Sequence, residues 1–594
     1  MKLRNEMSPE FTWDFTPMFS DRDAWSKACD EADKAIDLIP ALQGTLGESA
    51  ASLKKGLLTL SEVEEKVSLC YLYAMLLKST DGGDPDYQAM ESRTICLIVK
   101  LQSLSAFISP EIVAIPEETF NAYVAEPDMA DVAFKLKKVV KARAHTLDAK
   151  GELMLAKLTD AAQTPDNAFS MLNDVDLAFP MIKNDEGEEV QLTNGNFGVF
   201  RESAKREVRE GAFGAFFGTF KKFENTIAEL YGGSIKLDCY FASVRGYDSA
   251  RAAALFGNDV PESVYDSLIE AVHESLPYMR KYLELRKKTL GLPKIDMFDL
   301  YVPMVEDVDF DMPYEEGKAL VKEALKPLGE EYQALLDKAF SERWIDVYEN
   351  KGKRSGAFSC GVHGVHPYVL LNYTDKLNDA FTLAHELGHA MHSYKSSEAQ
   401  SFLNHNYSIM VAEVASTVNE VLLTLHLLKT ETDKKRRAYI LNHFLESFRT
   451  TLYRQTLFAE FEHKAHRMYE NGEPLTAQSF SALYKSLVEK YYEGAEINEL
   501  IANEWSYIPH FYNAFYVYQY ATGFSSAVAI AKRIVETGDA SGYLKFLTTG
   551  DTDYPIEELK IAGVDLTKPE TVKDALTLFA STIDELSTLL EDIK

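Results

Sequence analysis

The chain has 594 residues, of which 46% are hydrophobic and 26% are charged, a composition typical of a large globular protein with a sizeable core. Its formal net charge of -30 argues against a nucleic-acid partner and against an anionic membrane surface, because both require clustered Lys and Arg side chains. The five cysteines are scattered and show no paired-thiolate spacing, which favours a reducing compartment.

The amino-terminal stretch MKLRNEMSPEFTWDF contains no apolar run followed by a small-residue cleavage site, so we expect no secretory signal. No segment approaches the roughly 18 uninterrupted apolar residues that cross a bilayer, and we therefore expect no membrane partner. A cytoplasmic location is the simplest expectation. The sequence gives no indication of the oligomeric state.

Apolar residues recur at three- and four-residue spacing through most of the chain, which predicts a mainly α-helical protein. Gly, Pro and β-branched residues mark a few short strands near the middle of the chain. In chain order we expect a helix over 54–77, a strand with a polar turn within 173–192, a helix over 261–288, a strand at 297–305, two strands within 356–373, and a helix over 409–429.

Composition divides the chain into three expected regions. A turn-rich stretch ends an amino-terminal helical region at residues 1–131, and a small α/β unit follows at 132–200. Residues 201–594 form the third region, which is mostly helical and contains the candidate catalytic residues.

The stretch FTLAHELGHAMHSY, residues 381–394, places a cluster of polar side chains on an otherwise apolar helix. His385 and His389 are four residues apart, so their imidazoles lie one turn apart on one helix face, and Glu386 adjoins the first. Zinc lowers the pKa of a bound water to about 7, and a neighbouring carboxylate can accept its proton. A metal also explains the burial, because buried imidazoles and carboxylates without partners cost several kcal/mol.

A catalytic zinc ion usually takes three protein ligands, and the third must come from farther along the chain. Glu413 lies in an apolar helical run and is the predicted third ligand. Glu420 lies two turns later and is predicted to orient a zinc-binding histidine, with a solvated helix residue as the alternative. His392 and Lys395 occupy the positions that a metzincin gives to Gly and His, which excludes that class.

The segment at 371–394, followed by Glu413-Val-Ala-Ser416, resembles the thimet-type zinc oligopeptidases of family M3, and most closely their oligoendopeptidase F branch. The likeness extends over nearly the whole chain and includes FTWDFTPMF at 11–19, MFDLYVPM at 297–304, KRSGAFSCGVHGVHPYVLLNY at 353–373 and PHFYNAFYVYQYATG at 509–523.

This resemblance implies a large, mainly α-helical, two-lobed metallopeptidase with a closed, channel-containing shape and a small β-sheet beside the zinc helix. It implies one Zn²⁺ per chain, held by His385, His389 and Glu413, with Glu386 as the base. The implied reaction is hydrolysis of internal peptide bonds in short, unstructured peptides, with folded proteins excluded.

The aromatic run near the carboxyl end offers donors for the negative charge that develops on the carbonyl oxygen. His510 and Tyr518 are the candidate catalytic donors, and Tyr512 and Tyr516 are candidate substrate contacts. Which tyrosine within 512–520 contacts the oxyanion stays open, because the register of this segment is uncertain by about one helical turn. The alternative for most of them is packing in a core.

Residues 355–359 are a candidate sheet edge, to which an extended peptide can add through main-chain hydrogen bonds. Gly356 and Ala357 are small enough to let a substrate backbone approach closely. His363 and His366 in the following loop are candidate substrate contacts.

Three alternative functions remain at this point. A cysteine hydrolase would use Cys360 with a nearby His, but the thiol lacks the sequence context of such a family, and this function gives no account of the zinc helix. A non-catalytic peptide-binding helical protein would have no need for the base. A related zinc carboxypeptidase or dipeptidyl carboxypeptidase would trim chain ends and would not cut within them.

Overall fold

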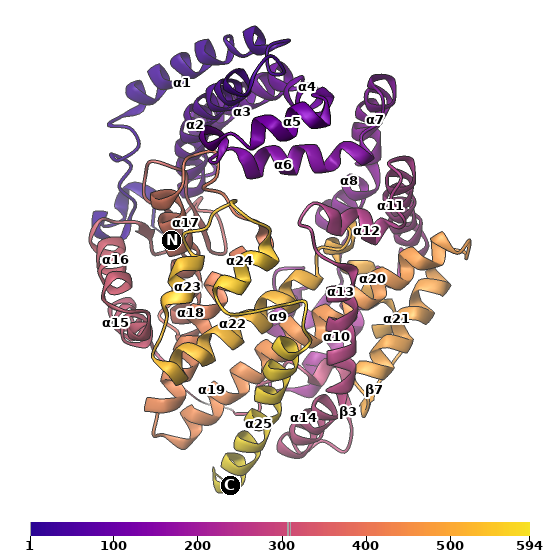
Figure 1. The fold of residues 1–594 in the computed structure, drawn as a ribbon. Coiled ribbons are helices and arrows are strands. Elements are labelled where there is room, and N and C mark those ends of the chain that lie inside the picture. The colour runs from indigo at the N-terminus through magenta and orange to yellow at the C-terminus, as the bar shows by residue number, and fades with distance from the viewer. Residues whose placement is uncertain (1, 306–307, 309, 594) are drawn as a thin grey trace. The chain divides into compact units, whose positions relative to one another are not determined.

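The computed structural model describes residues 2–305, 308 and 310–593, and Figure 1 shows it as a ribbon. The chain forms two compact units, each assembled from three separate stretches. These units cut across the three contiguous regions expected from composition, because packing between distant stretches defines them and chain order does not. The first unit is Met1–Ala144, Phe310–His426 and Ala527–Asp565, and the second is His145–Asp309, Leu427–Ser526 and Leu566–Lys594.

The first unit consists mainly of helices, which confirms the predicted fold class. α18 belongs to it as far as residue 426 and α22 from residue 527. Its helices are α1 (Arg22–Ile36), α2 (Ala50–Thr80), α3 (Pro85–Ser105), α4 (Ile108–Ala114), α5 (Glu117–Val124), α6 (Ala133–Lys141), α15 (Tyr314–Ala324), α16 (Glu330–Ser341), α17 (Leu377–Ala399), α18 (Ile409–Thr430), α22 (Tyr518–Thr537), α23 (Ser541–Phe546) and α24 (Pro555–Ile561).

A three-stranded sheet lies beside α17 in this unit, in the order β4-β6-β5. The central strand β6 (Tyr368–Leu370) is fully buried, and it pairs in parallel with β4 (Ile345–Asp346). β5 (Phe358–Cys360) pairs with β6 in antiparallel orientation and forms one edge of the sheet. Two strands within 356–373 and an edge near 355–359 were both predicted, and both are confirmed.

The amino-terminal segment holds this sheet in place. The indole N–H of Trp13 lies 3.0 Å from the carbonyl oxygen of Trp344 and 2.9 Å from that of Val369, so one buried side chain contacts the backbone beside β4 and within β6. The sheet is therefore held by a segment that lies more than 300 residues earlier in the sequence.

The second unit is helical around an aromatic core that includes Tyr231, Phe461 and Trp505. Its strands form two small sheets: β1 (Met181–Lys183) with β2 (Glu189–Gln191), antiparallel, and β3 (Ile295–Asp296) with β7 (Ala495–Glu496), parallel. Its helices are α7 (Ala149–Ala162), α8 (Thr164–Met171), α9 (Phe197–Arg201), α10 (Arg206–Lys222), α11 (Glu224–Val244), α12 (Ala250–Phe256), α13 (Glu262–Glu274), α14 (Leu276–Thr289), α19 (Lys434–Ser447), α20 (Arg454–Glu470), α21 (Ala477–Tyr491) and α25 (Glu570–Ile593).

Two predicted elements differ from the structure. The helix expected over 261–288 is two helices, α13 and α14, and Pro277 lies in the first turn of the second, where its missing N–H costs nothing. The strand expected at 297–305 begins instead as a 3₁₀-helix at Met297–Asp299, because the Asp299 carboxylate accepts a hydrogen bond of 3.0 Å from the backbone N–H of Asp296 and closes a tight turn.

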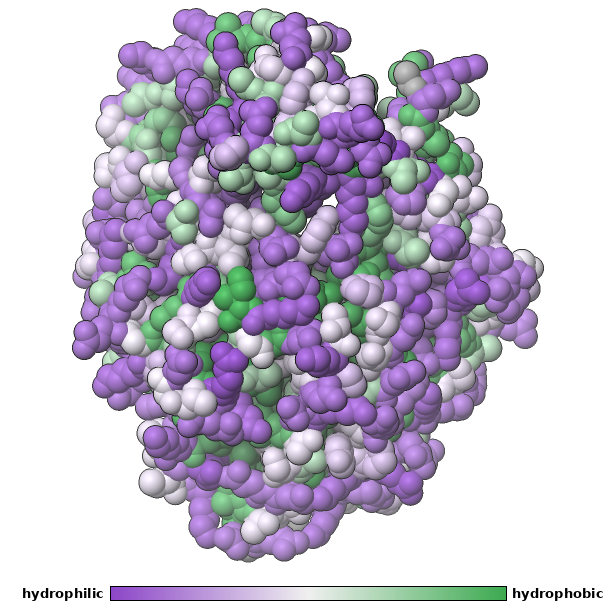
Figure 2. All heavy atoms as spheres, in the orientation of Figure 1, coloured by the Kyte–Doolittle hydropathy of each residue, from purple (hydrophilic) through white to green (hydrophobic). Residues whose placement is uncertain are grey.

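Hydrophilic side chains cover most of the face shown in Figure 2, as the strong net charge leads one to expect. Among the described residues, two helical stretches are apolar enough, by length and composition alone, to cross a membrane: Pro85–Ala114 and Ile409–Thr430. The second is a mostly buried helix, and the first includes the break between α3 and α4. The same criterion is met by core helices of soluble proteins, so it is weak evidence for a membrane span.

Candidate metal centre and active site

α17 presents the two predicted histidine ligands from within the core of the first unit. The Asp379 carboxylate accepts hydrogen bonds from the backbone N–H groups of Lys376 (3.0 Å) and Thr374 (2.8 Å), which fixes the start of this helix. The rings of His385 and His389 then lie one turn apart, with their centroids separated by 4.8 Å at an angle of 82°. The predicted convergence of these rings is what the structure shows.

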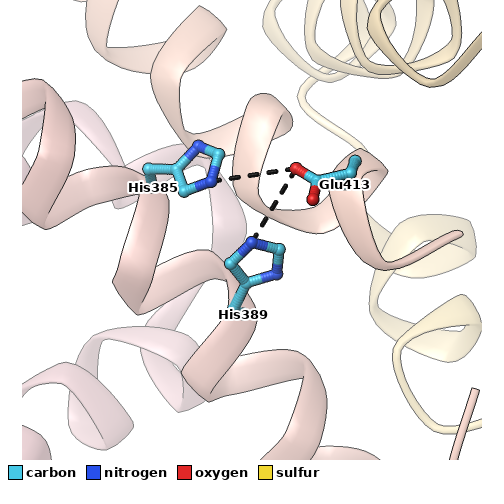
Figure 3. A group of neighbouring side chains, drawn as sticks. All are labelled: His385, His389 and Glu413. Atoms are coloured by element: carbon cyan, nitrogen blue, oxygen red, sulfur yellow. Dashed lines mark ion pairs between the residues drawn. The ribbon is translucent and has the colours of Figure 1, made fainter. Parts of the chain in front are cut away.

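Glu413, on α18, faces both rings (Figure 3). Its Oε2 lies 3.8 Å from Nε2 of His385 and 3.9 Å from Nε2 of His389. One ligand atom from each of the three residues lies within 4.8 Å of the other two. Two imidazole nitrogens and one carboxylate oxygen at this separation form a donor set that fits a divalent transition metal.

The close approach of α17 to α18 depends on Gly388, which lies between the two histidines. A Cβ atom at this position would lie 2.6 Å from both the carbonyl oxygen of Ala415 and the Cα of Ser416. Asn419 also joins the helices, because its amide donates a hydrogen bond of 3.0 Å to the carbonyl oxygen of Ala384. Sequence reasoning assigned no role to Gly388 or Asn419, and only the unusual glycine inside a helical motif could have indicated one.

Glu420 contacts His385, one of the two histidines that it was predicted to orient. Its Oε1 lies 2.6 Å from Nδ1 of His385, so it accepts that N–H and leaves Nε2 directed at Glu413. Burial lowers the pKa of His385, but the hydrogen bond and charge of Glu420, together with the charges of Glu386 and Glu413, raise it to about 9. A metal ligand must be a neutral imidazole, so a cation has to displace this proton.

Glu386 is almost completely buried, with 6% of its surface exposed. Burial and the negative charges of Glu413 and Glu420 raise its pKa to about 7, against the opposing effects of His385 and of a backbone hydrogen bond from Ser359. A carboxyl group that titrates near neutrality can both accept and return a proton under physiological conditions. The contact with Ser359 also places β5 next to this group.

The other two histidines of the helix are held neutral. Burial and the charge of His385 lower the pKa of His389 to about 3, which suits a metal ligand. His392 is fully buried and stacks on Tyr407 with ring centroids 3.7 Å apart. Within the described part of the chain neither ring nitrogen of His392 has a hydrogen-bond partner, so this residue belongs to the core.

Gly356 and Ala357, just before the edge strand β5, line a cavity of about 350 Å³ together with Thr382, which lies one turn before His385. Gly356 has a φ of +79°, a conformation that favours glycine. His363 engages Glu65 through Nδ1 (2.6 Å) and the carbonyl oxygen of Gln400 through Nε2 (3.1 Å), so both of its ring nitrogens have partners in this unit. Its contact with substrate stays a prediction.

The aromatic residues expected at the active site all lie in the stretch Leu427–Ser526, which belongs to the second unit. Tyr518 is buried, with 2% of its surface exposed, and packs against Tyr265. Tyr512 stacks on Phe169, with ring centroids 4.6 Å apart. Core packing, the alternative stated for most of these residues, therefore describes Tyr518, whereas Tyr512 is only partly buried.

Three polar aromatic residues form a separate group on the same segment. The exposed ring of His510 lies 6.2 Å from Tyr516 and 6.0 Å from Tyr520, between ring centroids. Tyr516 and Tyr520 are partly exposed, and their hydroxyls lie 3.4 Å apart. Tyr520 was among the open choices of the sequence analysis, and its partial exposure makes it available to a ligand.

Comparison with known proteins identifies relatives along the entire chain. The model of peptidase family M3 matches residues 199–578, and that of oligopeptidase F matches residues 111–179. Oligopeptidase PepF of Bacillus subtilis (strain 168) is 42% identical over 595 residues, which cover 100% of this chain and 89% of that protein.

Two solved structures extend the likeness to the fold. A chain from Chlamydophila abortus has a TM-score of 0.92 at 34% identity and covers 99% of this chain and 100% of its own. The structure of oligoendopeptidase-F from Enterococcus faecium has a TM-score of 0.75 at 36% identity, covering 96% and 99% respectively.

Proposed function

The chain belongs to peptidase family M3 and is a metalloendopeptidase of the oligoendopeptidase F type, and from this premise we propose that its metal is zinc, one ion per chain. We further propose that His385, His389 and Glu413 hold this ion and that Glu386 is the catalytic base. The observation that carries the proposal is the convergence of these three donors within 4.8 Å of one another. Imidazole nitrogen and carboxylate oxygen are the ligands that catalytic zinc prefers.

The remaining chemistry is carried by side chains around the donors. When bound, a zinc ion would polarise the scissile carbonyl group and lower the pKa of a water molecule to about 7. Glu386 takes the proton from the attacking water and returns it to the amine that leaves. Glu420 keeps Nε2 of His385 directed at the donor cluster, since its carboxylate accepts a hydrogen bond from the Nδ1–H group.

The edge of β5 is the proposed binding place for the substrate backbone. An extended peptide can add to a free sheet edge through main-chain hydrogen bonds, which gives affinity with little dependence on side chains. Gly356 and Ala357 adjoin this edge, and the Glu386 carboxyl group interacts with the backbone of Ser359 within it. Short unstructured peptides can adopt this extended form, whereas folded proteins do not present one.

For stabilisation of the oxyanion we propose His510 with Tyr516 or Tyr520. Burial of Tyr518 among core aromatics favours these partly exposed hydroxyls over the one first predicted. A donor to the developing charge is typically worth about 100-fold or more in rate. Tyr512 and His363 are retained as proposed substrate contacts.

Metal analysis tests the cofactor. The purified chain should contain one equivalent of zinc, lose peptidase activity with a zinc chelator, and regain it when zinc is restored. Retention of full activity after the metal is removed would refute the proposal and favour a thiol enzyme built on Cys360.

Substitution of Glu386 by Gln tests the base, because the amide keeps the shape of the side chain and cannot take a proton. Turnover should fall by several orders of magnitude while zinc content stays at one equivalent. Glu398→Gln is a matched control, since Glu398 is exposed on the same helix and should leave turnover unchanged. The substrate should be an internally quenched peptide blocked at both ends, because only an endopeptidase cleaves it.

A cytoplasmic location is proposed on the basis of cysteine chemistry. All five cysteines are free, and three of them, Cys29, Cys70 and Cys239, are buried. Such thiols persist in a reducing compartment. Detection of the active protein in the cytoplasmic fraction, with the envelope fraction as control, tests this assignment.

A further inference from the structure

A small cavity in the second unit is lined by an unusual concentration of positive charge. Arg201, Arg449 and Arg454 all reach it, and Glu504 is the carboxylate among its lining residues in the described chain. Apolar side chains, among them Phe213 and Leu300, form the rest of the wall. Cations in an apolar enclosure attract a negative charge more strongly than they do in water.

The acidic groups nearby already have partners. Glu504 accepts a hydrogen bond of 2.7 Å from Arg454, and Glu446 accepts one of 3.0 Å from Nε of Arg449. The side chain of Arg449 is only 1% exposed, so water does not screen its charge. These ion pairs balance the positive charges of Arg454 and Arg449 but not that of Arg201.

Arg201 forms no ion pair with a carboxylate of the described residues. Burial raises the pKa of Glu202, the next residue in the chain, and the charge of Arg201 opposes this rise without a direct contact between the two groups. Its guanidinium lies 3.8 Å from the ring centroid of Tyr301 and 4.7 Å from that of Phe197, and its Nε is buried with no hydrogen-bond partner. Contacts with aromatic faces only partly replace an anionic partner.

Two phenol groups line the same cavity. The hydroxyl of Tyr492 is buried, in a side chain only 3% exposed, and has no hydrogen-bond partner among the described residues. Burial alone would raise the pKa of Tyr301, but Arg454, Arg201 and Arg449 lower it to about 7, against the opposing effect of Glu504. The cavity therefore combines an unused hydroxyl donor with a potential that favours negative charge.

We propose that this cavity binds a monatomic anion, a halide such as chloride, held by Arg201 and by the hydroxyl groups of Tyr301 and Tyr492. Its volume of about 10 Å³ is at the lower limit for one water molecule, so a halide, which is larger than water, fits once the lining side chains move slightly apart. A peptide carboxylate or a phosphate group is too large for this volume. The ion supplies Arg201 with a direct anionic contact, and it accepts the hydrogen bond that the Tyr492 hydroxyl does not make to any described residue.

Thermal unfolding of the full-length chain tests this site. The midpoint should rise with the concentration of sodium chloride or sodium bromide and stay lower in sodium gluconate at the same ionic strength, because a ligand that binds the folded state stabilises it by mass action. Equal midpoints in all three salts would overturn the proposal.

Substitutions of the residues that line the cavity test whether the halide effect on the unfolding midpoint arises there. Tyr492→Phe and Arg201→Gln should each abolish the difference between chloride and gluconate. In gluconate, Tyr492→Phe should unfold at or above the wild-type midpoint, since it removes a buried hydroxyl without a partner. Arg280→Gln is the matched control, because Arg280 pairs with Glu493 on the exposed surface of the same unit and its loss should leave the halide response intact.

Crystals of the wild-type chain grown with bromide provide a test that does not depend on the folding of any variant. An anomalous scattering peak between Arg201 and Tyr492 is the expected result, and no peak in the cavity would overturn the proposal. Persistence of the full halide response in both cavity variants would overturn it as well. A third result would also overturn the proposal: a thermal unfolding midpoint that does not depend on halide, together with the ultraviolet absorbance of an ionised Tyr301 at neutral pH in chloride. The Tyr301 phenolate would then supply the negative charge that the proposal assigns to the ion.

Discussion

Replacement of Gly388 by Ala would test whether the close approach of α17 to α18 sets the metal-binding geometry. The added Cβ would lie 2.6 Å from the Cα of Ser416 and 2.6 Å from the carbonyl oxygen of Ala415. Non-bonded carbon atoms pack at about 3.5–4.0 Å, so the helices would have to separate by roughly 1 Å. Neither clashing atom belongs to a flexible side chain that could rotate away.

This separation would carry Glu413 away from the histidines, because Glu413 lies on α18 one turn before Ser416. Metal–ligand distances tolerate changes of about 0.2 Å, a fraction of the expected displacement. We expect zinc affinity to fall by at least the 10- to 100-fold typical of losing a supporting partner of a metal ligand, on the order of 1.4–2.7 kcal/mol. Overpacking should also destabilise the fold by about 1–3 kcal/mol, which the better helix propensity of Ala offsets by up to about 1 kcal/mol.

Competition with a chromophoric zinc chelator measures the affinity, and thermal unfolding measures the stability. Gly214→Ala in α10 is the matched control, because no atom lies within 4 Å of the Cβ that it adds. This control should keep wild-type zinc affinity and gain up to about 1 kcal/mol of stability. Wild-type affinity in Gly388→Ala would show that the helix spacing does not control the donor geometry.

Three further predictions follow from the charges and exposures at the two candidate groups of catalytic residues. Zinc affinity should rise about tenfold per pH unit up to pH 9, because His385 must lose its proton to bind. Glu420→Gln should flatten this dependence and should weaken binding 10- to 100-fold above pH 9, where no proton competes; an unchanged slope in the chelator titration would contradict the role of Glu420. The acidic limb of kcat/KM should lie no higher than about pH 7, where Glu386 loses its proton, since a nearby cation can only lower that pKa; a limb well above pH 7 would exclude Glu386 as the base. Tyr516→Phe or Tyr520→Phe should lower kcat about 100-fold with little change in KM, whereas Tyr518→Phe should remain near wild type, and the opposite ranking in steady-state kinetics would reinstate Tyr518.

Much of the metal centre could be predicted from local spacing. Two histidines four residues apart on a helix must share a face, and the apolar surroundings of Glu413 and Glu420 marked those carboxylates as groups that need partners. The distances of 3.8 and 3.9 Å to Glu413 and of 2.6 Å to Glu420 agree with that reasoning. The assignment of catalytic roles still awaits the experiments above.

Features that arise between distant segments could not be predicted in this way. The roles of Gly388 and Asn419 depend on how near α18 comes to α17, and no periodicity within either helix contains that distance. The two compact units join stretches that are hundreds of residues apart, so composition along the chain could not delimit them. Near Met297, β-branched and aromatic residues predicted a strand, but the hydrogen bond from Asp296 to Asp299 produced a turn.

The metal donors lie on two helices, with His385 on α17 and Glu413 on α18. A bound ion would therefore affect the stability of the fold as well as the reaction. A cation bound by His385 and Glu413 would cross-link the polypeptide and close the loop between these two residues, as a disulfide bond closes a loop. Closure of a loop of this size removes on the order of 3 kcal/mol of chain entropy from the unfolded ensemble. Loss of the ion would therefore lower the free energy of unfolding of the chain as well as its activity.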